Sequence, residues 1–405
     1  MFFMDLYKLS SYDYKLPKEL IAQKAHIPAD ECKLLYCKNW KLKDLIFKDI
    51  KDLLSDNDIL FFNNSKVVKA RIKGSHDFKQ DLQDDNIKFI IIWQNWEEKH
   101  CKNCEILFLK KLENNIFEAL VRPWKKFKIW TKIKIENQNK KYFFEVLDFT
   151  SEWRKIKYLG EEDIFEVLEQ IWKMPLPPYI EYSKEKESPY QPVQAKKEGS
   201  VAAPTASLHF TKQLFEDLKQ KWVEQLESTL HIWIWTFKVV DVEDITKYDI
   251  HSEMVEIPID IFKKIFEAKK LWKKVVAVGT TWTRILESLP YLYRKLQKIN
   301  SDNYQKIKND YFDGLELKNE DIDKFIGWDI FVENDIIYFD TKLYIFPWFK
   351  YKIVDKLITN FHLPKSSLLM LVAAFMWFED MMNAYEYAIK NKYRFFSFWD
   401  AMFIE

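Results

Sequence analysis

The chain has 405 residues, of which 48% are hydrophobic, and this is enough to bury the cores of two domains. Its 63 lysines and arginines nearly cancel its 62 aspartates and glutamates, so a nucleic acid would have to bind at a local basic patch. The longest apolar run, Ser366 to Phe378, is too short to span a membrane, and the N-terminus shows no secretion signal. We therefore expect a cytoplasmic monomer without a membrane partner.

The predicted elements change character twice along the chain. The first sixty residues read as short α/β elements and end in the strand Asp58–Phe62. From about 68 to 151 the chain has β-branched and aromatic runs separated by polar turns, which is typical of an all-β module; these runs are Phe89–Ile92, Glu105–Leu109, Ile116–Val121 and Tyr142–Val146. Beyond 151, helices such as Thr211–Lys221 alternate with buried strands such as Val275–Val278.

This order predicts a multi-domain α/β (α+β) protein. We expect an α/β main domain from residues 1–67 and 152–405, and an inserted β domain from residues 68–151, each with a barrel-like form. The highly charged residues 291 to 323 predict a helical or loose excursion from the main domain.

Glycine is scarce in this chain and tryptophan is abundant. There are 6 glycines and 16 tryptophans, where average usage would give about 28 glycines. Trp222 follows a predicted helix, Trp272 stands between a helix and a strand, and Trp348 follows a proline in a turn; such positions favour the positive φ of glycine. Our hypothesis is that the gene comes from a bacterium that decodes UGA as glycine. The alternative is a protein that is simply rich in tryptophan.

The four cysteines do not predict a metal site. Cys101 and Cys104 have zinc-ligand spacing, but Cys32 and Cys37 do not, and no other ligand cluster lies near them. We expect free thiols and no bound metal.

Residues that can perform chemistry gather in five stretches. Met174–Ile180 is rich in proline and predicts a rigid extended wall. In Val201–Phe210, small residues lead into a helix that Thr205 and Ser207 can cap. Val278–Arg284 predicts a strand that turns through a glycine into a helix, with two hydroxyls and an arginine near its start. The other two stretches are Thr229–Phe237 followed by His251–Glu253, and Ile358–Pro364 followed by Tyr393–Asp400.

In order and spacing, these stretches resemble the S-adenosylmethionine:tRNA ribosyltransferase-isomerase family of queuosine biosynthesis, from Leu16 to the C-terminus. The family pattern departs from this chain at Ser207, which stands at a usual glycine, and at Lys33 and Lys66, which stand at usual arginines and lose bidentate geometry. It also has glycine at nine tryptophan positions, which independently favours the recoding hypothesis: Trp124, Trp172, Trp222, Trp233, Trp235, Trp272, Trp348, Trp377 and Trp399.

The resemblance implies an enzyme that transfers and isomerises the ribosyl part of S-adenosylmethionine onto 7-aminomethyl-7-deazaguanine at the wobble position of a tRNA. Epoxyqueuosine forms, and adenine and methionine leave. S-adenosylmethionine is then the ribosyl donor and the tRNA is the partner. Because the sulfonium acidifies the C5′ proton, the site needs a general base, a hydrogen-bond donor for adenine and a dry pocket.

The residues that match the family motifs are expected to converge on one pocket. Simpler alternatives exist for three of them: His231 could be a hydrogen-bonded core residue, His362 could cap a turn, and Asp400 could pair with Arg394. The expected catalytic residues are Thr205, His209, His231, His251 and Glu253, and the expected S-adenosylmethionine-binding residues are Thr280, Thr281, Arg284, Asn360, His362 and Asp400.

Two other classes of function are open at this point. An S-adenosylmethionine-dependent RNA methyltransferase of the Rossmann type needs a glycine-rich turn after its first strand, and none is found near the N-terminus even with tryptophan read as glycine. A non-catalytic RNA-binding protein could explain the β insertion, but it does not need five polar stretches in the α/β part.

Overall fold

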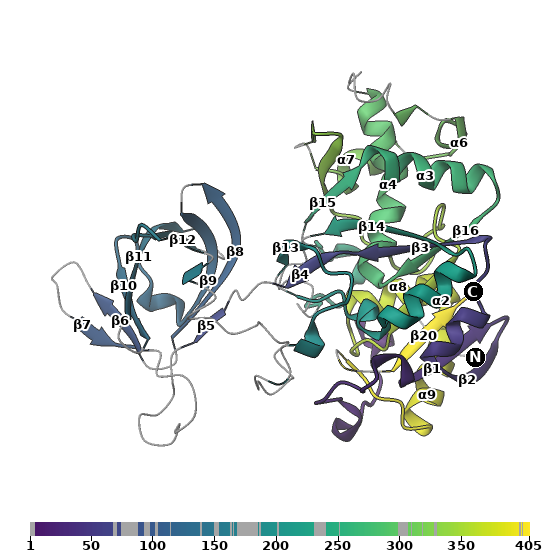
Figure 1. Cartoon of the computed structure of the whole chain (residues 1–405), viewed down its shortest axis with the longest axis horizontal. Helices are drawn as coiled ribbons and strands as arrows, with labels where there is room; N and C mark the ends of the chain where they lie inside the picture. The colour runs from purple at the N-terminus through teal and green to yellow at the C-terminus, as the bar shows by residue number, and fades with distance from the viewer. Residues whose placement is uncertain are drawn as a thin grey trace. The chain divides into compact units, whose positions relative to one another are not determined.

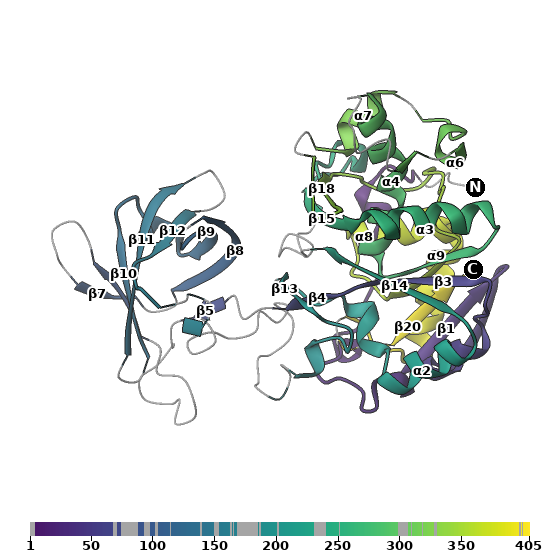
Figure 2. The same ribbon diagram turned by 45° about the horizontal axis from the view of Figure 1, so that its top comes forward.

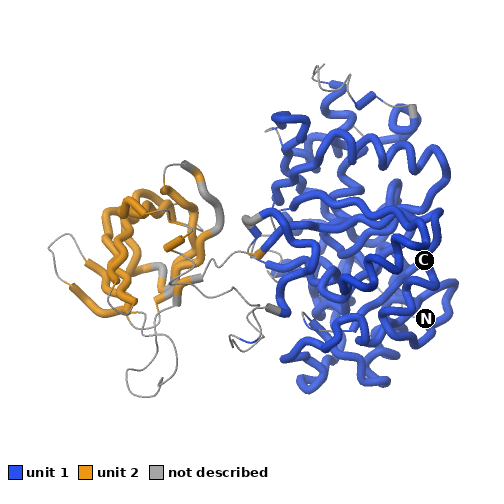
Figure 3. Tube along the Cα trace, viewed as in Figure 1, with its two compact units in different colours: residues 1–66, 176–405 blue, residues 67–175 orange. Residues whose placement is uncertain are grey.

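The computed structural model describes residues 5–67, 71–73, 88–92, 98–101, 104–113, 115–137, 140–149, 154–162, 164, 166–167, 185, 188–200, 202–230, 240–250, 252–298, 307–308, 310–317, 319–327, 330–396, 398 and 400–405. The chain divides into two compact units, residues 1–66 with 176–405 and residues 67–175 (Figure 3). The predicted end of the insertion at 151 is too early, because strand β12 (Arg154–Tyr158) pairs with two strands of the smaller unit, β9 and β11.

A ten-stranded mixed sheet forms the centre of the larger unit (Figure 1). β14, β3, β16 and β19 are neighbours and run parallel, while β15 is antiparallel to β14 and β20 is antiparallel to β19. The strands, in the order in which they pair, are β17 (Phe331–Glu333), β18 (Ile336–Thr341), β15 (Glu253–Pro258), β14 (Glu224–Leu230), β3 (Asp58–Asn63), β16 (Lys274–Val278), β19 (Lys356–Asn360), β20 (Ala401–Ile404), β1 (Lys33–Lys38) and β2 (Lys41–Ile46). The predicted mixed α/β class is confirmed.

Side chains of β3 alternate between the two faces of this sheet. Leu60 and Phe62 pack in a core that includes Leu214 and Leu218 of α2 (Lys212–Gln220). Phe61 points the other way and contacts Trp282 of α4 (Thr280–Lys298), with ring centroids 6.4 Å apart. Helices α2 and α4 therefore cover opposite faces (Figures 1 and 2). Burial on both faces explains why β3 is a continuous apolar run.

The remaining helices bear on two predictions, the excursion at residues 291 to 323 and the lack of a membrane-spanning segment. The predicted excursion of residues 291 to 323 is wrong for its first part, because α4 runs to Lys298 and its residues Tyr291–Tyr293 and Leu296 are buried. No single described helix is long and apolar enough to span a membrane, and α8 and α9 reach that length only as a pair bent by 113°. The other helices are α3 (Ile259–Lys270), α6 (Asp310–Asp313), α7 (Asn319–Phe325), α8 (Ser367–Met376) and α9 (Phe378–Lys390).

The smaller unit contains an eight-stranded sheet with antiparallel pairings. Its strands, in the order in which they pair, are β5 (Arg71–Lys73), β8 (Glu105–Glu113), β9 (Ile116–Arg122), β12, β11 (Lys140–Phe149), β10 (Lys132–Asn137), β6 (Lys88–Ile92) and β7 (Glu98–His100). All four predicted β runs lie in these strands. Neither sheet has a pairing between its two end strands among the described residues, so the barrel-like form of each part remains a prediction.

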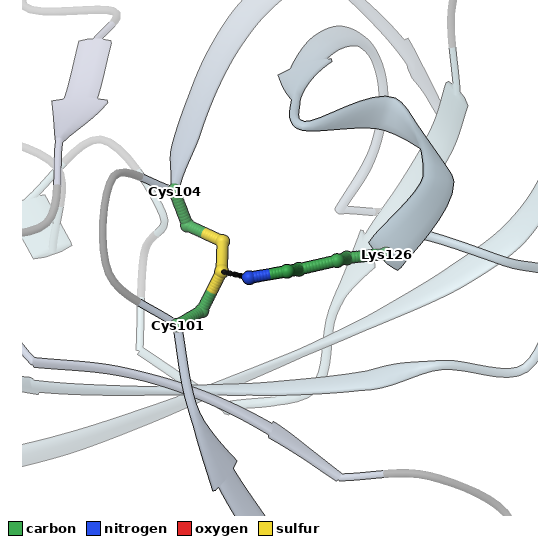
Figure 4. Close-up of a disulfide and its surroundings, with 3 residues drawn as sticks. All are labelled: Cys101, Cys104 and Lys126. Carbon is green, nitrogen blue, oxygen red and sulfur yellow. Dashed lines mark hydrogen bonds between the residues drawn. A yellow bond between two sulfur atoms is a disulfide. The ribbon is translucent and has the colours of Figure 1, made fainter.

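Cys101 and Cys104 form a disulfide between β7 and β8 (Figure 4). Their Cα atoms are 5.6 Å apart, and the Nζ of Lys126 donates a hydrogen bond to the Sγ of Cys101 at 3.6 Å. The prediction of four free thiols is wrong for this pair, because one short connection brings both side chains together. Cys32 and Cys37 are free and buried.

The connection from β16 to α4 has the predicted strand–glycine–helix form, with Gly279 at φ 99°. The predicted capping roles of Thr205 and Ser207 are wrong. Both lie inside a short 3₁₀ turn, η8 (Thr205–His209), and α2 begins later, where the Oγ1 of Thr211 accepts a hydrogen bond from the N–H of Leu214 at 3.1 Å.

Among the residues that the structure describes, six tryptophans adopt the left-handed backbone conformation that favours glycine. Their φ angles are between 59° and 78°: Trp40, Trp130, Trp222, Trp272, Trp348 and Trp377. Trp377 combines φ 75° with ψ 148°, a region that is essentially restricted to glycine. Trp222 and Trp272 are 82% and 86% exposed, so burial of the indole does not explain either position. The backbone therefore supports the glycine hypothesis at these sites.

Only some of the nine tryptophans at family glycine positions have a positive φ among the described residues. Trp222, Trp272, Trp348 and Trp377 have positive φ, whereas Trp124 in η5 (Trp124–Lys126) does not. Trp40 and Trp130 also have positive φ but were not predicted. The other four positions lie outside the described residues: Trp172, Trp233, Trp235 and Trp399.

We expect the double substitution Trp222→Gly and Trp272→Gly to raise the free energy of unfolding. Each change relieves strain of about 1 kcal/mol or more, and the exposed indoles lose little burial. Urea denaturation measures the difference. Trp282→Gly is the control, because this side chain is only 1% exposed inside α4 and its loss should destabilise the protein by about 3 kcal/mol or more.

A loss of stability in the double variant as large as that of Trp282→Gly would contradict the glycine hypothesis. At the level of the gene, the hypothesis predicts UGA codons at the positive-φ tryptophans. Peptide mass spectrometry of protein from the native organism should then find glycine at Trp222 and Trp272.

Candidate active site

The carboxyl ends of four parallel strands meet at one edge of the ten-stranded sheet. β3 ends there at Asn63, β16 at Val278 and β19 at Asn360, with β14 beside them. β15 runs the other way and begins at this edge with Glu253, and β20 begins there directly after Asp400. In open α/β sheets, ligands bind outside the carboxyl ends of the parallel strands. The strand directions therefore bring segments from the whole chain to one edge.

The turn η8 lies against this edge. A Cβ atom placed on Gly279 would lie 3.7 Å from the Cβ of Ala206, and the Nδ2 of Asn360 lies 2.7 Å from the Nε2 of His209. Thr205 begins this turn. The buried Oγ of Ser207 has no hydrogen-bond partner among the described residues, so it is free to bind a ligand.

His209 is held as a neutral imidazole. The Nδ2 of Asn360 can only donate, so Nε2 accepts, and the proton on Nδ1 points to the Sγ of Cys32 at 3.2 Å. Burial lowers the pKa of His209 to about 3, because the charged form loses its hydration. His209 also lines a cavity of about 410 Å³ together with His26 and Phe398. This side chain therefore suits hydrogen bonding better than proton storage.

His362 and Asp400 are largely engaged by the fold. The ring Nε2 of His362 lies 3.0 Å from the Oγ1 of Thr359. The backbone N–H of His362 donates a hydrogen bond to the hydroxyl of Tyr385 at 2.8 Å. Burial lowers the pKa of His362 to about 3. Asp400 accepts hydrogen bonds from the N–H groups of Lys33 and Arg394, at 3.0 and 2.7 Å, and pairs with the guanidinium of Arg394 at 3.1 Å. The simpler alternative for Asp400, pairing with Arg394, matches the observed contact, whereas among the described residues the ring of His362 contacts the hydroxyl of Thr359 and not a backbone group of a turn.

A second polar group surrounds Arg284 on α4. Its Nη1 lies 2.8 Å from the Oε2 of Glu253 in a buried ion pair, and its Nε donates to the carbonyl of Leu343 at 2.9 Å. Its Nη2 is buried and has no hydrogen-bond partner among the described residues. Thr280, which is buried, and Thr281, which is partly exposed, begin α4 one turn earlier. The free Nη2 is a donor that fits an anionic ligand.

The predicted residues thus form two groups along one edge. Four strand spacings of about 4.8 Å separate β15 from β19, so Glu253 and Asn360 are roughly 19 Å apart along the sheet. Thr280 lies between them at the end of β16. His231 and His251 fall outside the described residues. No group of three or more His, Cys, Asp or Glu that could hold a metal ion occurs in the described part of the chain.

Two residues at this edge were missed by sequence reasoning. Cys32 contacts His209, although the two are far apart in sequence. Asn63 joins β3 to β14, because its Oδ1 accepts from the N–H of Leu230 and its Nδ2 donates to the Leu230 carbonyl, both at 3.2 Å. No local pattern marks either residue. Only the strand order could have indicated them, because it brings the start of β1 and the end of β14 to the same edge of the sheet.

The fold and this edge define an α/β protein with a polar candidate site at the carboxyl ends of its parallel strands. A family model described as queuosine biosynthesis protein matches residues 9–404, and the chain belongs to this family.

Several relatives match this chain in sequence over nearly their full length. The chain is 39% identical to the S-adenosylmethionine:tRNA ribosyltransferase-isomerase of Sulfurihydrogenibium sp. over 401 residues, and 36% identical to that of Halothermothrix orenii over 400 residues; each alignment covers 98% of this chain and 99% of the relative. A solved S-adenosylmethionine tRNA ribosyltransferase from Thermotoga maritima is 29% identical, with a TM-score of 0.47, over 98% of this chain and 100% of that one.

The buried neutral state of His209 predicts a pH dependence of stability. The unfolded chain binds a proton on this residue below about pH 6.5, and the folded chain binds it only near pH 3. Its contribution is therefore complete above pH 6.5 and is lost as the pH falls towards 3. At pH 5 the free energy of unfolding should be lower by about 2 kcal/mol than at pH 7 on this account.

His209→Gln should reduce this fall when urea denaturation is measured between pH 7 and pH 5. His100→Gln is the matched control, because it makes the same replacement at an exposed histidine on β7 in the smaller unit. Equal pH dependence in the wild type and in His209→Gln would show that His209 is not held neutral.

Proposed function

We propose that the chain is an S-adenosylmethionine:tRNA ribosyltransferase-isomerase of queuosine biosynthesis. It transfers and isomerises the ribosyl part of S-adenosylmethionine onto 7-aminomethyl-7-deazaguanine at the wobble position of a tRNA, and it releases adenine and methionine. The observation that carries this proposal is the identity of 36–39% over 98% of the chain with relatives of that name. The donor is S-adenosylmethionine, the partner is the tRNA, and the compartment is the cytoplasm.

Arg284 is proposed to bind the methionine carboxylate of the donor. Its Nη2 is buried without a partner among the described residues, while Glu253 and the carbonyl of Leu343 hold the rest of the guanidinium in place. An arginine fixed in this way presents a charge-assisted donor without further loss of side-chain freedom. Thr280 and Thr281, at the start of α4, are proposed to hold the sugar or the same carboxylate, aided by the N-terminus of the helix.

Asn360 is proposed to bind the donor through its amide, which His209 orients. Burial keeps His209 uncharged, and Asn360 and Cys32 engage both of its ring nitrogens, so it positions Asn360 and does not store a proton. Removal of the acidified C5′ proton then falls to one of the other candidates, which are Glu253, His231 and His251. Thr205 and the free Oγ of Ser207 are proposed as donors to adenine or the sugar.

Incubation with labelled S-adenosylmethionine and tRNA tests the reaction class. We expect adenine to be released only when the tRNA carries the 7-aminomethyl-7-deazaguanine base. Formation of S-adenosylhomocysteine would instead indicate a methyltransferase, and the absence of both products would indicate a non-catalytic binder. Either of these two outcomes would contradict the proposal.

Arg284→Lys should raise the KM for S-adenosylmethionine by about 10-fold or more, because one charge-assisted hydrogen bond is worth about 1.5–3 kcal/mol. Steady-state adenine release measures this effect. Arg154→Lys is the control, since it also removes a buried arginine whose Nε donates to a backbone carbonyl, that of Phe127 at 2.8 Å, but in the smaller unit. Equal KM values in the two variants would contradict the role of Arg284.

A further inference from the structure

A second cavity, of about 1090 Å³, lies in the larger unit. Lys342 and Tyr344 line it, and they flank Leu343, whose carbonyl accepts the hydrogen bond from the Nε of Arg284. Tyr248 also lines this cavity, five residues before Glu253. The lining thus includes the two sequence neighbours of the residue that holds Arg284, and we name this cavity the basic cavity.

The lining of the basic cavity has more positive than negative charge. Among the described residues of the lining, six basic side chains face three acidic ones, although the whole chain has a net charge of only +1. Lys298, Lys342 and Lys350 are exposed, and within the described part of the chain no carboxylate forms an ion pair with them. The six basic side chains are Arg294, Lys298, Lys324, Lys342, Lys350 and Lys352.

Aromatic side chains also line the basic cavity, and two of them, Phe346 and Phe349, are half-buried. Tyr344 contacts Tyr248 and Phe346, with ring centroids 5.5 and 5.1 Å apart. The Nζ of Lys352 lies 4.8 Å from the ring centroid of Phe349. Trp348 also lines the cavity, at a backbone position whose positive φ favours glycine.

One wall of the basic cavity is fixed by a buried carboxylate. Glu287 of α4 is fully buried and accepts hydrogen bonds from the N–H groups of Lys352, Ile353 and Val354 at 2.8–2.9 Å. This contact holds the segment that carries Lys350 and Lys352 against α4. The cationic surface is therefore formed before a ligand arrives, which lowers the entropy cost of binding.

Cations that alternate with aromatic faces suit single-stranded nucleic acid, because phosphates bind the lysines and bases stack on the rings. We propose that the basic cavity binds the single-stranded anticodon-loop nucleotides next to the modified base. This inference rests on the proposed function, which supplies the tRNA partner. It assigns to Lys298, Lys342, Lys350 and Phe349 a role in binding RNA that is separate from binding of the donor.

The test compares two variants with equal loss of charge. The first is Lys298→Gln/Lys342→Gln/Lys350→Gln, and the control has three exposed lysines changed elsewhere: Lys43→Gln/Lys219→Gln/Lys263→Gln. Fluorescence anisotropy with a labelled anticodon stem-loop RNA measures Kd across a salt series. The cavity variant should bind at least 10-fold more weakly, with a slope of log K against log salt smaller by about 2, because single strands lose about 0.7 per phosphate contact. The control should show a clearly smaller change in both.

Phe349→Leu tests stacking separately. It should weaken RNA binding by about fivefold or more with an unchanged salt slope, while its urea midpoint stays near that of the wild type. Binding of S-adenosylmethionine, measured by equilibrium dialysis, should be unchanged in all of these variants. Equal weakening by the cavity and control triples, or undiminished RNA binding by Phe349→Leu, would overturn the proposal.

The assay on the wild type distinguishes this inference from the proposed function. If the wild type releases adenine from S-adenosylmethionine with tRNA but the cavity variant behaves like its control, only the basic cavity is assigned wrongly. If the wild type neither releases adenine nor binds the RNA, both proposals are wrong.

Discussion

The shared direction of β14, β3, β16 and β19 is the constraint on which the site depends. Each parallel strand delivers the next few residues of the chain to the same edge, and each crossover returns the chain to the opposite edge. Asn63 holds this edge together by hydrogen bonds in both directions with Leu230. Since the directions are fixed by pairing, His209 and Asn360 come within 2.7 Å of each other although 151 residues separate them.

The strained turns at Trp222 and Trp272 lie at the opposite edge of the sheet from the candidate site. Trp222 and Trp272 stand just before β14 and β16, at the amino ends of the parallel strands, and both indoles are exposed. At these two turns the cost of tryptophan is therefore backbone strain and not obstruction of the site. The chain can form the sheet with these residues present, but with less free energy of unfolding than glycine would give.

Much of the fold follows from local sequence pattern, whereas the site does so only in part. The apolar runs of β3 and β16 and the amphipathic α2 are visible in the sequence because burial repeats with a fixed period. The end of the insertion was placed too early because β12 follows a polar turn and shows its membership only through pairing with β9 and β11. No sequence pattern indicates that Cys32 belongs to the candidate site, because its contact with His209 depends on the position of β1 in the sheet. The motif residues Glu253 and Arg284 were found, but their ion pair was not.

The central claim is that the carboxyl edge of the parallel strands binds S-adenosylmethionine. Hydrogen exchange with mass spectrometry, with and without S-adenosylmethionine, tests it most directly. We predict slower exchange in peptides that contain Leu208–Phe210, Gly279–Thr283 and Asn360–His362, and no change in the turns at the opposite edge around Trp222 and Trp272. Protection at that opposite edge, or no protection at the carboxyl edge with saturating S-adenosylmethionine, would contradict the account.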